Sequence, residues 1–287
     1  MGPGEVVILN PHGFCAGVTG ALRKALSLLG DPSRNPAVPV YCLHEIVHNE
    51  IVVGALRDRG MVFTDSLSGV SEGLTVLFSA HGVGPAVRRE AAMRRLRVVD
   101  ATCPFVTRVH TAARSFASRG LPVVVIGHAA HAEVRGILGE IEDVAGSAAV
   151  VSSPDDCSTP PLDGWGRIGV VSQTTMNSDD VRSIVEELGR RHAVETTAET
   201  CRATKERQDA ARAFDGDALL VLGSANSSNT RRLCEVARTP RVFRAAAIEE
   251  VRAIDFSDVR RLGVTSGAST PEDFFNEVVA FLRGGAK

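Results

Sequence analysis

The sequence contains no two cysteines close enough to form a C-x-x-C motif. This absence excludes a zinc ribbon and a ferredoxin-type run of cluster ligands, because both need closely spaced cysteines. No apolar run approaches the roughly 18 residues that span a bilayer, and no basic leader precedes an apolar stretch at the beginning. A formal net charge of -2 gives no electrostatic reason to bind nucleic acid or an anionic membrane. We therefore expect a cytoplasmic globular protein with neither of these partners.

Six cysteines are present, and they are far apart along the chain. Because the cytoplasm keeps thiols reduced, we do not expect disulfides, which leaves metal binding, catalysis or burial. Three of the six are expected to be small buried side chains: Cys42, Cys157 and Cys234. The other three share a context, since each follows a β-type stretch and precedes a helical one: Cys15, Cys103 and Cys201.

The similar intervals between these three cysteines indicate a repeated unit. Each third of the chain has two strand-like stretches that end in polar loops, with a helical stretch after the first loop. This βαβ order predicts an α/β fold of parallel sheets with helices on their faces. We expect three small α/β domains, at residues 1–102, 103–199 and 200–287.

The polar loops of the three thirds of the chain carry different kinds of side chain. Ligands of parallel sheets bind beyond the carboxyl ends of the strands, so these loops are candidates for one shared site. Imidazole, hydroxyl and amide groups together with helix N-termini favour an anion such as phosphate. Two alternatives stay open, because a single histidine can be structural and "NSSNT" is also a normal helix N-cap. The candidate residues are His44, His48, His81, His128, His131, Glu133, Thr174, Thr175, Ser227, Ser228, Asn229, Ser266 and Ser269.

Three thiolates on one metal assembly favour iron and sulfur over zinc, although three sulfurs and a water could also hold zinc. With three cysteine ligands, a four-iron cluster would keep one iron open for an exogenous group.

Eight motifs in order, between about residue 6 and residue 280, carry a family resemblance. They are "GFCAGV", "HEIVHN", "SAHGV", "DATCP", "GHAAHAEV", "QTT", "GSANSSNT" and "GVTSGAST". The sequence resembles the 4-hydroxy-3-methylbut-2-enyl diphosphate reductases, the LytB-type iron-sulfur reductases of the non-mevalonate isoprenoid pathway. This resemblance implies three α/β domains in a pseudo-threefold trefoil around a central 4Fe-4S cluster. It also implies that Cys15, Cys103 and Cys201 hold the cluster and that the substrate's hydroxyl oxygen binds the fourth iron.

The resemblance further implies a reductive dehydroxylation. Two electrons, from a ferredoxin or flavodoxin, and two protons would remove water from the substrate and leave isopentenyl and dimethylallyl diphosphates. Glu133 would deliver protons with Thr174 in the relay, and burial beside an anion is expected to raise the pKa of Glu133. The residues implied to hold the diphosphate are His44, His81, His131, Ser227, Ser228, Asn229 and Ser269.

Two positions depart from the family pattern: His12 stands where arginine is usual, and Ala132 where proline is frequent. Two other functions on the same fold stay open. One is a paralogue that acts on another allylic diphosphate, and the other is a non-catalytic sensor of a metabolite or an iron-sulfur cluster.

Overall fold

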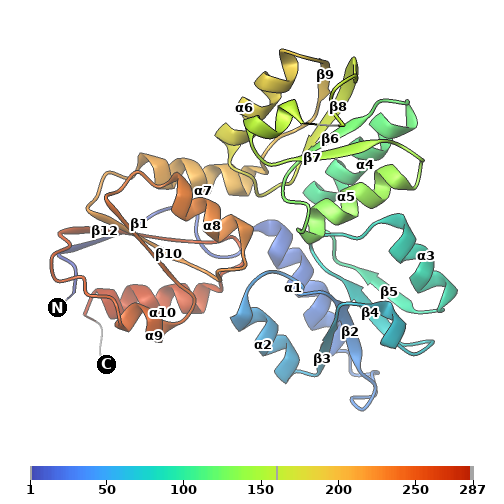
Figure 1. The fold of residues 1–287 in the computed structure, drawn as a ribbon. Helices are drawn as coiled ribbons and strands as arrows, with labels where there is room; N and C mark the ends of the chain where they lie inside the picture. The colour runs from blue at the N-terminus through green and yellow to red at the C-terminus, as the bar shows by residue number, and fades with distance from the viewer. Residues whose placement is uncertain (1, 160, 285–287) are drawn as a thin grey trace. The chain divides into compact units, whose positions relative to one another are not determined.

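The computed structural model describes residues 2–159 and 161–284, and it contains three four-stranded sheets (Figure 1). The strand pairs described are all parallel, as the βαβ pattern predicts. The chain divides into two compact units. Unit 1 comprises the segment through Val18, Val47–Ala55 and the segment from Cys201 onward, and unit 2 comprises Thr19–Ile46 and Leu56–Thr200.

The first sheet lies in unit 2 and has the strand order β3-β2-β4-β5. Its strands are β2 (Val40–Leu43), β3 (Met61–Thr64), β4 (Thr75–Phe78) and β5 (Arg97–Asp100). Helices α1 (Ala16–Leu29) and α3 (Pro85–Met93) and the short 3-10 helix η1 (Leu67–Gly69) belong wholly or mostly to the same unit, whereas most of α2 (Glu50–Asp58) belongs to unit 1.

The second sheet also lies in unit 2 and has the order β7-β6-β8-β9. Its strands are β6 (Val123–Ile126), β7 (Ala148–Val151), β8 (Arg167–Ser172) and β9 (Ala193–Thr196). Helices α4 and α5 cover one face of this sheet, whereas α6 covers the other. These elements are α4 (Pro104–Ser118), α5 (Ala132–Glu142) and α6 (Ser178–Gly189), with the 3-10 helix η2 (Pro154–Ser158).

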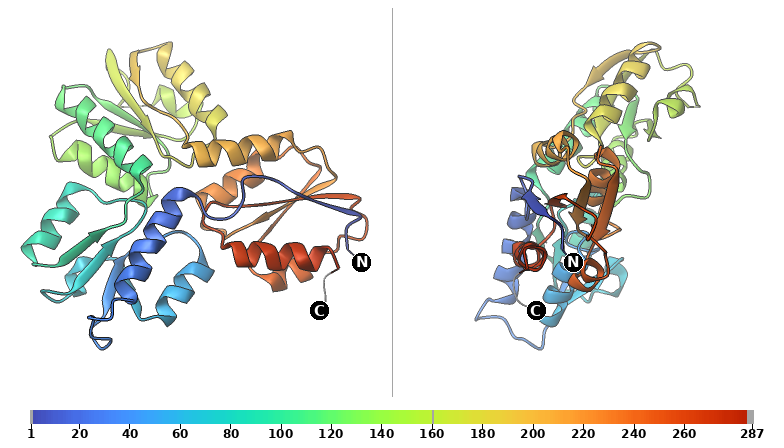
Figure 2. Two further views of the ribbon diagram at one scale, coloured as in Figure 1. Left: turned by 180° about the vertical axis from the view of Figure 1, so that it is seen from behind. Right: turned by 90° about the vertical axis from the view of Figure 1, so that its left-hand side faces the viewer.

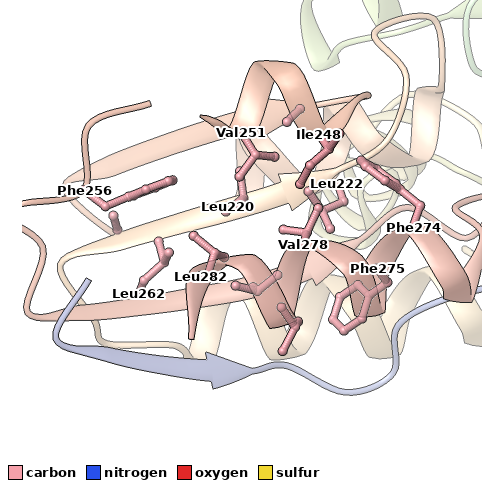
Figure 3. Close-up of a cluster of buried hydrophobic side chains, with 14 of the residues drawn as sticks. Leu220, Leu222, Ile248, Val251, Phe256, Leu262, Phe274, Phe275, Val278 and Leu282 are labelled. Atoms are coloured by element: carbon pink, nitrogen blue, oxygen red, sulfur yellow. The ribbon is translucent and has the colours of Figure 1, made fainter. Parts of the chain in front are cut away.

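The third sheet lies in unit 1 and has the order β1-β12-β10-β11. Helices α7 and α8 pack on one face, and α9 and α10 on the other (Figure 2, left). Figure 3 shows leucines of β10 and β12 in one core with Phe274 and Phe275 of α10. The elements are β1 (Glu5–Ile8), β10 (Ala218–Leu222), β11 (Arg241–Ala245), β12 (Arg261–Ser266), α7 (Arg202–Ala213), α8 (Ser228–Val236), α9 (Ile248–Arg252) and α10 (Glu272–Leu282).

Strand β1 belongs to the sheet of the C-terminal third, which differs from the predicted first domain of residues 1–102. It pairs with β12, from Glu5 opposite Arg261 to Ile8 opposite Val264. The sequence could not show this because its short apolar run fits any sheet edge, and the partner strand is distant in the chain. The boundaries at 102/103 and 199/200 stay a prediction.

The position of β1 reveals how the repeat is built. One edge strand of each sheet, namely β5, β9 or β1, is followed by a cysteine and then by a helix. Cys103 follows β5, Cys201 follows β9 and Cys15 follows β1. Each candidate cysteine therefore lies after the edge strand of one sheet and begins the helix that follows.

Among the helices of residues 2–159 and 161–284, none combines the length and the apolar character that crossing a bilayer needs.

Glycine at position 169 in β8 is required by the packing of α4. A Cβ there would lie 2.5 Å from the ring of Phe116, which fills the space above the strand. We expect Gly169→Val to destabilise the protein by about 2 kcal/mol or more, because overpacking a buried contact forces strain. Chemical denaturation measures this change. Gly166→Ala is the control, since a Cβ there meets nothing within 4 Å, and equal stability of both variants would contradict the packing account.

Candidate active site

Cys103 lies at the beginning of α4, directly after a turn in which both carboxylate oxygens of Asp100 accept hydrogen bonds. Asp100 accepts hydrogen bonds from the backbone N–H and the hydroxyl of Thr102, and Arg88 donates to its second oxygen at 2.6 Å. The N–H of Cys103 donates to the carbonyl of Ala80 at 3.0 Å. The partly exposed thiol therefore occupies the N-cap of α4, where the helix dipole favours negative charge.

Cys15 and Cys201 both belong to unit 1, and each directly precedes a helix. The N–H of Cys15 donates to the carbonyl of Ala268 at 3.0 Å, and its Sγ lies 3.5 Å from the N–H of Val18 in the first turn of α1. Cys201 is the N-cap of α7, and its Sγ lies 3.2 Å from Oγ1 of Thr204. Both thiols are partly exposed, so both are accessible as ligands.

A buried arginine joins these two cysteine segments. Arg207 of α7 is 2% exposed, and its guanidinium donates to the carbonyls of Gly13 and Ala203, each at 2.8 Å. Burial lowers the pKa of Arg207, whereas the neighbouring thiols of Cys15 and Cys201 act in the opposite direction. An arginine remains protonated even so, and unit 1 therefore keeps one fixed positive charge beside two candidate ligands.

The other three cysteines have different surroundings. Cys42 and Cys157 are buried as expected, whereas Cys234 is only partly buried. Burial is the main cause that raises the pKa of Cys42 to about 12 and the pKa of Cys157 and Cys234 to about 11. A cysteine binds a metal as the thiolate, and these three thiols resist ionisation.

Glu133 and Thr174 form a buried pair in unit 2. Glu133 is the second residue of α5 and is 1% exposed, and Thr174 follows β8. The backbone N–H of Thr174 donates to one carboxylate oxygen at 2.7 Å, and its hydroxyl lies 3.0 Å from the other. Burial raises the pKa of Glu133 to about 7, against the opposing effect of the two hydrogen bonds. The side chain can therefore hold or release a proton near neutral pH.

Two predicted histidines lie near Glu133 in the same unit. His131 is the N-cap of α5, and its Nδ1 accepts a hydrogen bond from the N–H of Glu133 at 3.2 Å. This assigns the proton of the neutral ring to Nε2, which is then a donor. The His81 ring lies 5.7 Å from that of His131 in an edge-to-face arrangement.

Glycines set the close approach of the loops that carry these histidines. A Cβ on Gly84, at the beginning of α3, would lie 3.2 Å from Cα of Gly139 in α5, and the reverse distance is the same. The two helices can therefore meet backbone to backbone, which brings the loops of His81 and His131 together.

His44 lies at the carboxyl end of β2 in a left-handed conformation, with φ of 60°. This conformation is uncommon for a residue with a side chain. Its Nδ1 lies 3.2 Å from Oδ1 of Asp65.

The predicted hydroxyl and amide groups gather at the beginning of α8 in unit 1. Ser227 is the N-cap and accepts from the N–H of Thr230, and Asn229 accepts from the N–H of Ala268 at 2.9 Å. Ser269 donates to the carbonyl of His48 at 3.1 Å. Ser227, Ser228 and Asn229 are buried at the positive end of a helix, which is a suitable environment for phosphate oxygens. The cap and the ligand-binding interpretations of "NSSNT" are therefore compatible.

Sequence reasoning missed the polar face of α7. The buried residues Thr204, Arg207, Gln208 and Ala211 have the spacing of one helical face, but three of them are polar. A search for apolar periodicity overlooks such a face. The spacing of its polar residues was the available signal.

The two departures from the family pattern have structural partners. His12 stacks on Phe275, with ring centroids 4.0 Å apart, and its Nδ1 lies 3.4 Å from Glu272. Ala132 is the first residue of α5, between His131 and Glu133.

Within the described residues, no group of three or more histidine, cysteine or acidic side chains is arranged to hold a metal.

The fold and these groups define a class: a parallel-sheet α/β protein with thiols, imidazoles and hydroxyls at the carboxyl ends of its strands. The sequence matches the model of the LytB protein family over residues 6–283. The chain therefore belongs to the LytB family.

Named relatives agree with this membership. A Methylococcus capsulatus protein named 4-hydroxy-3-methylbut-2-enyl diphosphate reductase is 41% identical over 97% of this chain and 90% of its own length. A Salmonella typhi protein of the same name is 39% identical over 97% of this chain and 89% of its own. These likenesses confirm the family resemblance of the sequence.

Two solved structures are also similar. The Plasmodium falciparum E-1-hydroxy-2-methyl-but-2-enyl-4-diphosphate reductase has a TM-score of 0.85 and 30% identity, covering 97% of this chain and 88% of that one. A structure described as (E)-4-hydroxy-3-methyl-but-2-enyl diphosphate reductase, the terminal enzyme of the non-mevalonate pathway, has a TM-score of 0.71 and 31% identity, covering 99% and 100%.

The raised pKa of Glu133 predicts an effect on stability. Between about pH 4.5 and pH 7 the folded protein keeps a proton that the unfolded chain releases, so the free energy of unfolding falls as the pH rises. Glu133→Gln removes this contribution. Denaturation curves of both proteins at pH 5 and pH 8 measure it, and we expect the variant to gain stability relative to the wild type at the higher pH. An unchanged difference would contradict the raised pKa.

Proposed function

We propose that this protein catalyses the reductive dehydroxylation of 4-hydroxy-3-methylbut-2-enyl diphosphate. Two electrons and two protons convert the substrate into water and isopentenyl or dimethylallyl diphosphate. The observation that carries the proposal is the buried Glu133–Thr174 pair, because it supplies a proton donor active near neutral pH. The names of the relatives support the same reaction.

The proposed cofactor is a 4Fe-4S cluster with Cys15, Cys103 and Cys201 as ligands. The donor set fits this group, because all three thiols are partly exposed at helix beginnings and none is in a disulfide. The buried, protonated Cys42 and Cys157 fit it poorly. When bound, the cluster would supply the electrons and act as a Lewis acid that assists C–O cleavage.

The diphosphate is proposed to bind the hydroxyl, amide and imidazole groups of the loops. The N-terminus of α8 provides backbone N–H groups and a favourable dipole, as for other phosphate sites. In the neutral ring of His131 the proton lies on Nε2, because Nδ1 accepts from the N–H of Glu133. The proposed diphosphate ligands are His44, His81, His131, Ser227, Ser228, Asn229 and Ser269.

Glu133 is proposed to deliver protons, with Thr174 in the relay. At pH values below about 7 the carboxyl holds its proton, and Thr174 fixes both of its oxygens. Since the neutral form is the donor, activity should decline as the pH rises above about 7. A proton can leave or reach the Glu133 carboxyl through the hydroxyl of Thr174.

We also propose a cytoplasmic location and a ferredoxin or flavodoxin as the electron donor.

Replacement of the proposed ligands tests the cofactor. We expect Cys15→Ser, Cys103→Ser and Cys201→Ser each to lose most of the iron and sulfide that the anaerobically purified wild type carries. Cys234→Ala is the matched control, because this partly buried thiol has a raised pKa. Iron and sulfide analysis measures the loss, and a full cluster in any of the three serine variants would exclude that cysteine.

Glu133→Gln tests the proton donor. The amide keeps the size of the side chain but cannot donate the required proton, so we expect at least a hundredfold lower kcat with dithionite-reduced enzyme, in the range of general acid catalysis. Iron content and pyrophosphate binding should stay unchanged, which separates chemistry from folding. Turnover at the wild-type rate would remove Glu133 from the mechanism.

A further inference from the structure

Thr204 lies between a proposed cluster ligand and a proposed diphosphate ligand of unit 1. Its Oγ1 is 3.2 Å from Sγ of Cys201 and accepts a hydrogen bond from Nδ2 of Asn229 at 3.1 Å. Thr204 is 1% exposed, so the hydroxyl makes these contacts away from bulk water. A threonine inside a helix often bonds to a carbonyl one turn earlier, but this hydroxyl contacts two functional side chains instead.

The hydrogen-bonding capacity of the hydroxyl suits a thiolate. A hydroxyl has one hydrogen to donate and two lone pairs that accept, and Asn229 already donates to it. When Cys201 is a thiolate, the hydroxyl hydrogen can turn to the sulfur while the bond from Asn229 remains. Hydrogen bonds to cluster sulfurs stabilise the more negative, reduced cluster and raise its reduction potential.

Asn229 is fixed at its other end as well. Its Oδ1 accepts from the N–H of Ala268 at 2.9 Å, and the carbonyl of Ala268 accepts from the N–H of Cys15 at 3.0 Å. The amide of Asn229 is therefore connected to Cys201 through one hydroxyl and to Cys15 through one peptide group. Loss of the Thr204 contact would leave the amide held on only one side.

We propose that Thr204 is a positioning residue that donates to the Cys201 sulfur and orients Asn229 for the diphosphate. This inference rests on the proposed function, since it assumes the cluster and the anion. It assigns to a side chain of α7 two separable effects, one on the reduction potential and one on anion affinity.

Thr204→Val tests both effects, because valine keeps the shape and lacks the hydroxyl. We expect a more negative midpoint potential in a redox titration followed by electron paramagnetic resonance of the anaerobically purified protein. We also expect pyrophosphate, used as the probe, to bind about three- to tenfold more weakly by calorimetry, as for the loss of one hydrogen bond. Thr204→Ser should restore both values, and Thr204→Ala provides a second loss variant if valine impairs folding.

Thr265→Val is the matched control. Thr265 is 1% exposed on β12 of the same unit, and its hydroxyl has no hydrogen-bond partner, so its replacement should change neither quantity. An unchanged potential in Thr204→Val and Thr204→Ala, or a changed potential with unchanged pyrophosphate affinity, would overturn the proposal for Thr204 alone. A wild-type protein that takes up no cluster would instead overturn the proposed function and this inference together.

Discussion

The carboxyl ends of parallel strands, where the next helices begin, determine where the proposed functional groups of this protein lie. A helix beginning leaves backbone N–H groups without helical partners, and its dipole favours negative charge. Cys103, Cys201, His131 and Ser227 are all N-cap residues, and Cys15 directly precedes α1. Thiolates and phosphate oxygens are the anions that such positions stabilise.

Burial favours the neutral form of Glu133 but leaves Arg207 charged. Glu133 is buried without a cation among the causes of its shifted pKa, so desolvation favours its neutral, protonated form. Arg207 is also buried, but it remains charged, and its guanidinium donates to the carbonyls of Gly13 and of Ala203 in α7. One unit thus contains a neutral acid suited to proton transfer, and the other contains a fixed cation beside two thiols.

Much of the fold follows from local sequence patterns. The buried run Val123–Ile126 and its polar loop identify a parallel strand, and the repeated cysteine context predicts three similar α/β arrangements. The pairing of β1 with β12 could not be predicted, because strand pairing depends on a distant segment and not on local pattern. The Glu133–Thr174 pair was foreseen only through the family resemblance, whereas Thr204 and Arg207 escaped notice because the buried face of their helix is mostly polar.

The central claim is that Cys15, Cys103 and Cys201 hold one iron-sulfur cluster. Crystals of the anaerobically purified protein, measured at the iron absorption edge, test it most directly. The account predicts one anomalous peak, of cluster size, within bonding distance of all three sulfurs. Iron bound at Cys42 or Cys157, or a peak that reaches only one or two of the three sulfurs, would contradict it.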